Sequence, residues 1–333
     1  MRKYIIPPIV LSLMLILCGC ASKATIYGNY RAIETLQLVG AIGIDREEDG
    51  SVRLSSCSQL GVEDSKPVII SAVAPSITEA MLVCQDYSSK VELYYAHTSS
   101  AVLGEETLKY GIGEIMDCVE REQQFRDGMS VFAVRGGMAL ELFEGFAEAD
   151  ATIADMLLSL EEDVKKDSRA IVPNFGEIAK DLADSGVALI CSIEIRDPKE
   201  IVLSEEDAEA IAVPAGFAVL KNGRLAGFLD ENAAKGVCLL LGKAKNSVRV
   251  EPVWDGEKLQ RVKIFIKAEG VEEEIQSCVF EAIEASRALE ADFLKIGSRI
   301  KLKSPVKFAS IEEDWTQSWK DVEITLDVDW QAA

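Results

Sequence analysis

The residue with the most specific chemistry is Cys20, a thiol placed to receive lipid near the start of the chain. Gly19 stands directly before it and is small enough for a peptidase pocket, and Leu17 stands three positions before it. Cys18 is a poorer acceptor because the bulky Leu17 precedes it. A small residue before the cut is what leader peptidases require. We therefore predict a lipoprotein signal peptide over residues 1–19 and a diacylated Cys20 at the start of the mature chain.

The residues before Cys20 have the composition of an export leader. Arg2 and Lys3 supply a basic start, and residues 5–17 form an apolar run. That run is short for a stable bilayer span, which needs about 20 residues. The alternatives are an ordinary signal peptide with a chance cysteine, or an uncleaved helical anchor. We expect residues 20–32, which are small and polar, to be a lipidated tether for a water-soluble ectodomain.

The chain is strongly acidic, with 35 lysines and arginines against 56 aspartates and glutamates and a formal net charge of −21. Loss of residues 1–19 removes two basic and no acidic side chains, which makes the mature net charge about −23. Nucleic-acid phosphates need a basic patch, so this composition argues against a nucleic-acid partner. It argues equally against general adhesion to anionic headgroups. The acyl chains on Cys20 must therefore supply the membrane anchor.

No residue pattern after the leader predicts a catalytic, cofactor or metal site. The single histidine, His97, has no Gly-x-Ser-x-Gly elbow to accompany it, and a histidine metal site would need more histidines. Phosphate-binding glycine motifs are missing, and Tyr110-Gly111-Ile112-Gly113 lies inside a helical pattern. The acidic run 272–274 fits the first turn of a solvated helix. We expect His97 to be structural and Trp315 and Trp319, four residues apart, to form the buried face of a helix.

Six cysteines follow Cys20 at wide intervals, with no Cys-x-x-Cys pair among them. Such spacing is typical neither of a zinc site nor of a dense disulfide framework. Most of these cysteines stand within apolar runs, where a thiol acts as a small hydrophobic side chain. We predict free core thiols and a non-oxidising setting. The six are Cys57, Cys84, Cys118, Cys191, Cys238 and Cys278.

We predict that helices and strands alternate through the first half of the chain. Ser76-Ile77-Thr78-Glu79 has the spacing of a capping box, and Asp150 is placed to cap a later helix. The predicted elements are strands at 36–45 and 52–60 joined through Asp49-Gly50, a helix at 75–88, a strand at 99–103, a helix at 105–121, a strand at 131–135 and a helix from Asp150 to the charged run 161–167.

The second half contains predicted hairpins. Asn222-Gly223 can adopt the positive φ angles of a type I′ turn, and Asp230 can cap the helix that follows. The predicted elements are strands at 187–195, 215–220 and 225–229, a helix at 230–241, strands at 248–254 and 259–268 with a turn at Asp255-Gly256, a helix from Glu272, a short helix at 310–319 and a final alternating strand at 322–330.

This irregular mixture of strands and helices predicts an α+β fold with three consecutive mixed domains, each a small, mostly antiparallel sheet with packed helices. We place the N-terminal domain at residues 33–168, the middle domain at 169–243 and the C-terminal domain at 244–333.

Four blocks resemble the C-subunit lipoproteins of bacterial spore germinant receptors, the GerAC family. The blocks occur in family order and span almost the whole mature chain. One departure is the tether, because the family commonly places Trp-Asp directly after the lipidated cysteine and Ala21-Ser22 stands here. The blocks are Arg31-Ala32-Ile33-Glu34-Thr35-Leu36 running into Ala41-Ile42-Gly43-Ile44-Asp45; His97 through Leu103-Gly104-Glu105-Glu106; Gly216-Phe217-Ala218-Val219-Leu220 with Gly227-Phe228-Leu229-Asp230; and Ala291-Asp292-Phe293-Leu294-Lys295-Ile296-Gly297 with Pro305 and Trp315.

The resemblance implies a three-domain α+β protein held on the outer face of the inner spore membrane. Such a protein works beside an A subunit and an integral-membrane B subunit in nutrient sensing, with no assigned reaction and no cofactor. Two alternatives come from other classes: a solute-binding lipoprotein of a transporter, with two similar lobes around a ligand cleft, and a secreted hydrolase.

Overall fold

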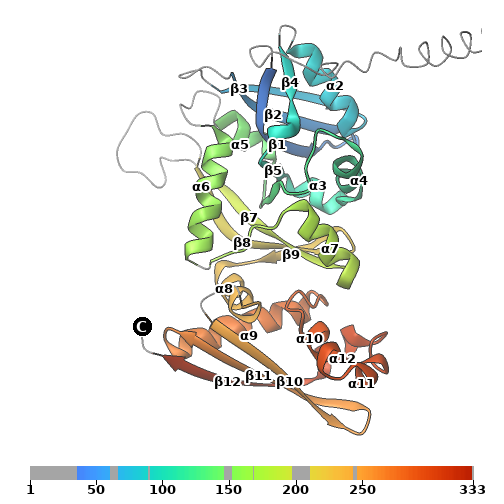
Figure 1. The fold of residues 1–333 in the computed structure, drawn as a ribbon, viewed down its shortest axis with the longest axis vertical. Coiled ribbons are helices and arrows are strands. Elements are labelled where there is room, and N and C mark those ends of the chain that lie inside the picture. The colour runs from blue at the N-terminus through green and yellow to red at the C-terminus, as the bar shows by residue number, and fades with distance from the viewer. Residues whose placement is uncertain are drawn as a thin grey trace, which may run out of the picture.

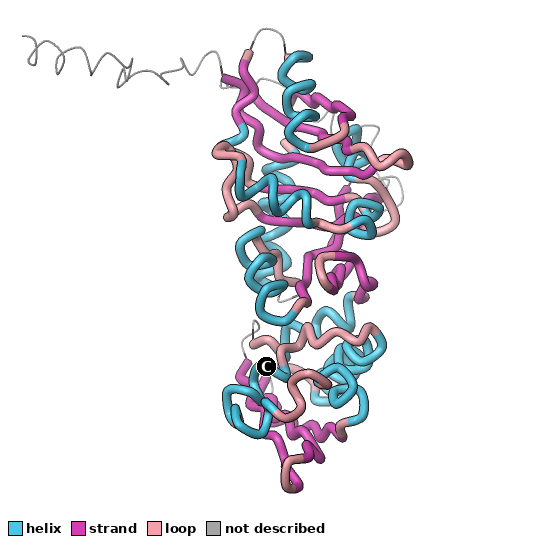
Figure 2. The backbone as a smooth tube through the Cα atoms, turned by 90° about the vertical axis from the view of Figure 1, so that its right-hand side faces the viewer, coloured by secondary structure: helices cyan, strands magenta, loops and turns pink. Residues whose placement is uncertain are grey.

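The computed structural model describes residues 36–60, 67–88, 91–145, 152–167, 169–196, 211–242 and 246–331. Over these ranges the protein is an elongated molecule with two bodies stacked along its long axis (Figures 1 and 2). The upper body surrounds a nine-stranded sheet and the lower body contains a three-stranded sheet. Cys20 and the predicted tether lie outside the described residues. None of the described helices has the length and apolar character needed to cross a bilayer.

The nine-stranded sheet has a parallel centre and antiparallel ends. Strands β5 and β4 pair parallel with β1, and β5, β6 and β7 continue the parallel run. The order is β3-β2-β1-β5-β6-β7-β8-β9, with β4 beside β1. The strands are β1 (Leu36–Arg46), β2 (Val52–Leu60), β3 (Val68–Ala74), β4 (Glu92–Tyr94), β5 (Ser100–Leu103), β6 (Ser130–Val134), β7 (Val187–Arg196), β8 (Ile211–Lys221) and β9 (Arg224–Leu229).

Helices cover both faces of this sheet because its central strands are apolar on both sides. In β6, Phe132 and Val134 face one core cluster, whereas Val131 and Ala133 face the other. The first face is covered by α5 (Ala139–Gly145), α6 (Ile153–Lys166) and α8 (Glu231–Leu240). The second is covered by α2 (Ile77–Tyr87), α3 (Glu105–Tyr110), α4 (Gly113–Arg121) and α7 (Phe175–Ser185).

The lower body packs helices against one small sheet (Figure 1). Strand β11 pairs antiparallel with β10 and parallel with β12. The strands are β10 (Asn246–Asp255), β11 (Lys258–Glu269) and β12 (Glu323–Gln331), and the helices are α9 (Glu272–Ala288), α10 (Ile296–Lys303), α11 (Pro305–Ala309) and α12 (Trp315–Asp321).

Local sequence signals are confirmed where side chains contact their own backbone. The Ser76 hydroxyl accepts from the Glu79 amide at the start of α2, and the Asp230 carboxylate accepts from the Ala233 amide at the start of α8. Asn222 and Gly223 both have positive φ, as the type I′ hairpin between β8 and β9 requires. Short-range geometry is therefore well encoded in these segments.

The sheets differ from the expectation of one small, mostly antiparallel sheet per domain. Strand β6 pairs in parallel with β7, so the first sheet runs across residue 168, where we expected a domain boundary. Strands β7 to β9, expected in a separate middle unit, complete this sheet. The physical reason is that β5 and β6 are buried on both faces and leave hydrogen-bonding edges that a later strand must pair. The mixed α and β content is as predicted.

Three helical expectations are also corrected. The helix predicted over 105–121 is divided into α3 and α4, because Gly111 has φ +117 and the next amide, of Ile112, donates to the Gly223 carbonyl. Thr152 caps α6, and Asp150 lies outside the described residues. The helix expected at 310–319 begins only at Trp315. Strand β3 and helices α5, α7 and α10 were not predicted.

Helix α8 joins the two bodies. It packs on β8 of the upper sheet and crosses α9 of the lower body. At the crossing, a Cβ added to Gly236 would lie 1.9 Å from the Cys278 carbonyl oxygen and 2.9 Å from the Ala282 Cβ. One continuous buried cluster extends from Phe132 through α8 to Trp319. The crossing therefore fixes how the two sheets sit relative to each other.

We predict that Gly236→Ala destabilises the protein by about 1–3 kcal/mol, because a close helix crossing cannot accept the extra methyl group without a backbone shift. Urea unfolding followed by circular dichroism measures the loss. Gly113→Ala is the matched control, since an added Cβ there meets no atom within 4 Å. Equal stability of the two variants would contradict the proposed role of the crossing.

Candidate functional site

His97 lies at the molecular surface between β4 and β5. It ends the short 3-10 helix Tyr95–His97, is exposed, and its ring centroid lies 5.8 Å from that of Tyr94. The block that contains it continues into β5 and reaches Gly104. The structure therefore places His97 at a strand end, as expected, in contact with one aromatic ring.

The carboxyl ends of β1 and β5 bring the first two sequence blocks together around a buried carboxylate. Asp45 is only 2% exposed, and its two oxygens accept the amides of Ala139 and Leu140 at 2.7 and 2.8 Å. These amides open α5, so Asp45 satisfies donors that have no partner within the helix. A Cβ added to Gly104 would lie 2.0 Å from an Asp45 oxygen, which explains the glycine.

Burial dominates the electrostatics of Asp45. Loss of hydration raises the pKa of this carboxyl from 3.8 to about 6, against the opposing effect of the Ala139 and Leu140 hydrogen bonds. The carboxylate is buried against the first turn of α5 and accepts two of its amides. Its chemistry is that of an internal cap.

The third block forms a close backbone approach rather than a binding site. Gly216 has φ +84, and a Cβ there would lie 2.2 Å from the Leu229 carbonyl oxygen. The Asp230 side chain then caps α8 through the Ala233 amide at 2.8 Å. These residues place the helix that joins the two bodies.

The fourth block surrounds a second engaged carboxylate. Asp292 accepts the amides of Ile296 and Gly297 at 3.0 and 2.7 Å, and the Trp315 indole nitrogen donates to it at 3.0 Å. Burial raises the pKa of this carboxyl, with the hydrogen bonds acting in the opposite direction. Asp292 thus fixes the loop between α9 and α10.

Trp315 and Trp319 form the inner side of α12, as predicted. Trp319 is fully buried and donates to the Ser286 hydroxyl at 2.9 Å, while the two indole rings are 5.9 Å apart. The acidic run Glu272–Glu274 lies in the first turn of α9, also as predicted. The reading of Tyr110 to Gly113 as part of one helix is wrong, because Gly111 ends α3.

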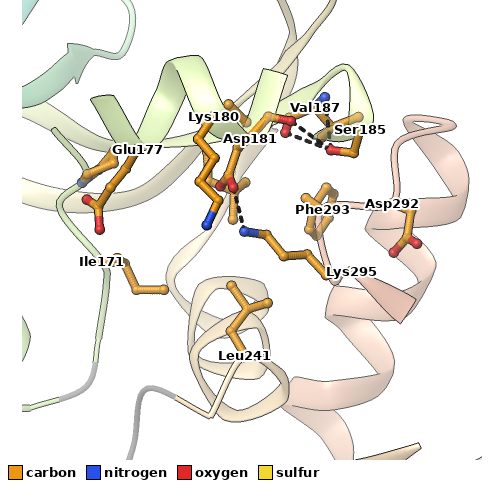
Figure 3. Close-up of a pocket in the computed structure, with 13 residues that line it drawn as sticks. Ile171, Glu177, Lys180, Asp181, Ser185, Val187, Leu241, Asp292, Phe293 and Lys295 are labelled. Atoms are coloured by element: carbon orange, nitrogen blue, oxygen red, sulfur yellow. Dashed lines mark hydrogen bonds and ion pairs between the residues drawn. The ribbon is translucent and has the colours of Figure 1, made fainter. Parts of the chain in front are cut away.

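The loop 289–295 between α9 and α10 also lines a cavity of about 240 Å³ between the two bodies (Figure 3). Its walls come from α7, the start of β7, the end of α8 and the loop itself. The Lys295 ammonium reaches across to the Asp181 carboxylate at 2.6 Å, and the Lys180 side chain projects into the same space. The lining residues are Ile171, Pro173, Glu177, Lys180, Asp181, Ser185, Val187, Ala188, Leu189, Leu241, Asp292, Phe293 and Lys295.

Sequence analysis did not identify this cavity. Asp181 and Lys295 are 114 residues apart, and α7 was not predicted at all. The nearest sequence signal is the family-like block that contains Asp292, Phe293 and Lys295, which was quoted for its resemblance and not as a cavity wall. Only the stacking of the bodies brings α7 to that loop.

The described residues offer little redox or metal chemistry. Six free cysteines are all buried, and burial raises the pKa of Cys191 to about 12 and that of Cys84 to about 11. Thiols with such pKa values are poor nucleophiles. No group of three or more His, Cys, Asp or Glu residues within the described ranges could hold a metal ion.

Comparisons with known proteins match the regions that contain the first, second and fourth blocks. Residues 29–195 match the family described as "Spore germination protein N-terminal domain", and residues 257–332 match "Spore germination B3/GerAC like, C-terminal". The crystal structure of the GerBC protein is similar in fold, with a TM-score of 0.53 and 13% sequence identity. The alignment covers 87% of this chain and 96% of GerBC. No curated protein matches the chain.

The raised pKa of Asp45 predicts a pH dependence of stability. Because the folded state holds the Asp45 proton more tightly than the unfolded state, this residue favours folding below about pH 4 and loses that contribution as pH rises through about 6. The shift corresponds to about 3 kcal/mol. The free energy of unfolding of the wild type should therefore fall relative to that of Asp45→Asn between pH 4 and pH 7.

Chemical denaturation of both proteins across this pH range measures the difference. The two proteins share every other carboxylate, so the difference between their unfolding free energies removes the pH dependence that those groups contribute. A difference that stays constant from pH 4 to pH 7 would show that Asp45 titrates normally.

Proposed function

The chain belongs to the GerAC family of spore germination proteins, and from this premise we propose that it is a non-enzymatic lipoprotein subunit of a spore germinant receptor. In this proposal it assembles with the A and B membrane subunits of the receptor, and the assembly triggers germination in response to a nutrient. The observation that carries the proposal is the ordered match of both family regions, together covering most of the chain.

We place the protein on the outer face of the inner spore membrane, held by lipid on Cys20. The support is chemical: Gly19 and Leu17 give Cys20 the setting of an acylated thiol, and the apolar run before it is an export leader. One modified residue anchors stably when it carries more than one acyl chain. The net charge of about −23 after loss of residues 1–19 keeps the ectodomain soluble and makes lipid, rather than basic residues, the source of membrane attachment.

The lipid anchor gives the subunit its mechanistic advantage. Confinement to the membrane raises the effective concentration of the ectodomain beside the integral subunits, so a weak docking surface suffices for assembly. Faces of the two bodies would then couple nutrient binding elsewhere in the receptor to release of the spore contents. No bond is made or broken by this chain in the proposal.

The two buried carboxylates are consistent with a non-enzymatic role. Asp45 and Asp292 are the acids of two family-like blocks, and each accepts backbone amides at a helix start. The exposed His97 lies beside the Tyr94 ring. In a receptor subunit the two carboxylates would serve to hold the backbone in place, as their hydrogen bonds do here.

A solute-binding lipoprotein of a transporter has less support. That function calls for two similar lobes that close on a ligand, whereas this chain has one sheet of nine strands and one of three. Helix α8 also packs tightly against α9 at Gly236, which opposes hinge motion between the bodies.

We predict that Cys20→Ala releases the protein from the membrane and strongly impairs nutrient-triggered germination, because the acylated thiol is the only anchor in the proposal. Membrane fractionation and metabolic labelling with palmitate measure attachment, and loss of spore optical density measures germination. Cys18→Ala is the matched control and should retain both properties.

The Cys20→Ala ectodomain should keep its circular dichroism spectrum, since every described element lies beyond residue 35. Normal germination with a soluble, unlabelled Cys20→Ala protein would contradict the anchor. Crosslinking of the wild-type receptor in spore membranes, followed by mass spectrometry, tests assembly with the A and B subunits independently.

A further inference from the structure

Strand β3 forms one edge of the upper sheet (Figure 1). Among the described strands only β2 pairs with it, through seven residue pairs and without a bulge. In an antiparallel strand, alternate residues direct their N–H and C=O groups away from the neighbouring strand. The outer side of β3 therefore presents backbone donors and acceptors that fit an added strand, as in β-augmentation.

The other edge strands of the described chain carry features that oppose pairing with a second chain. At β4, the Gln85 side chain accepts from the Leu93 amide and donates to the Val91 carbonyl. Strand β9 begins with Arg224, has a bulged register with β8 and packs beside α3. Strand β10 contains Pro252 and a bulge, and β12 carries three acidic side chains.

Strand β3 has none of these protective features. Its sequence is Val-Ile-Ile-Ser-Ala-Val-Ala, and residues 67–78 contain no charged side chain. Pro67 and Pro75 bound the strand and leave its seven amides in place. Uncharged strands rich in β-branched residues pair readily with other strands when their edge is open.

The side chains of β3 are apolar on both faces of the sheet. Val68 and Val73 point to opposite faces and are 38% and 41% exposed. Ile69 packs against the first core cluster and Ile70 against the second. An added strand would therefore extend both layers of the core, and its own side chains must be uncharged and apolar on both faces.

Electrostatics favours a second copy of this chain as the added partner. In a twofold-symmetric contact each surface meets itself. With 56 acidic against 35 basic residues, most surfaces of this chain would then place like charge against like charge. The uncharged stretch 67–78 avoids that repulsion. Strand β3 also has the composition that its own edge requires of a partner.

We propose that β3 of one chain pairs antiparallel with β3 of a second copy, so that the two upper sheets become continuous. Pairing centred on Ser71 uses all seven residues of each strand. It sets Ile69 of one chain opposite Val73 of the other, and Val68 opposite Ala74, which are apolar pairs. A contact of this size gives a weak, reversible dimer. The proposal goes beyond the receptor role and does not depend on the lipid anchor.

Sedimentation velocity of the full chain in excess detergent micelles measures the association. The dimer fraction should rise with chain concentration. It should also rise with salt, because salt screens the repulsion between two acidic chains. Hydrogen exchange locates the contact: amides of β3 should gain protection at high chain concentration, whereas those of β10 and β12 should not.

Substitutions of exposed side chains identify the edge. Val73→Lys should weaken dimerisation at least about tenfold, because a lysine on an edge strand opposes pairing with another chain. Val68→Lys tests the other end of β3, and Val73→Thr should retain association because threonine is uncharged and β-branched. Leu158→Lys is the matched control, since Leu158 is 53% exposed and belongs to α6. Circular dichroism confirms that each variant is folded.

A monomer at every concentration would overturn the proposal, and so would association that weakens with salt, which indicates an interface of charge pairs. A dimer with unchanged exchange at β3, or one that Leu158→Lys weakens as much as Val73→Lys does, would also overturn it. Every variant keeps the same leader, so association through the leader cannot produce a difference between them. Failure of this test would leave the receptor role untouched, because no other receptor subunit is present.

Discussion

The structure depends on one close contact, the crossing of α8 over α9 at Gly236. A Cβ at position 236 would overlap the Cys278 carbonyl oxygen, so only glycine lets the two helices approach this closely. Through this crossing one buried cluster extends from the upper sheet to Trp319 in the lower body. The bodies are consequently joined by packed core rather than by a linker. The Asp181–Lys295 ion pair and the cavity both lie between the bodies and need this placement.

Buried carboxylates serve the same architectural purpose at two other points. Asp45 holds the start of α5 at the carboxyl ends of β1 and β5, and Asp292 holds the loop before α10. A buried carboxylate needs hydrogen bonds to offset lost hydration, and free amides at a helix start provide them. In this chain, an acid of each of these two blocks therefore shapes the local backbone. This use is compatible with a receptor subunit that works through its surfaces.

Short-range features were predictable because their partners are close in the chain. The Asn222-Gly223 turn and the Ser76 and Asp230 caps each involve residues within about one helical turn, and all three occur as expected. The parallel pairing of β6 with β7 was not predictable, because it joins segments separated by α5, α6 and α7. The break at Gly111 also escaped prediction, since its cause is a contact with the distant Gly223.

The sequence by itself determined the acidic composition, the local turns and caps, and the ordered blocks that resemble the family, while the leader and the acceptor Cys20 stay predictions. Each is a property of composition or of neighbouring residues, for which chain order is sufficient. The tertiary structure alone decided that the described chain has two sheets rather than three and that Asp45 and Asp292 cap helices. It also decided that Lys180 and Lys295 line the same cavity. These outcomes arise from packing between segments far apart in the chain, where burial and close approach select one partner among many.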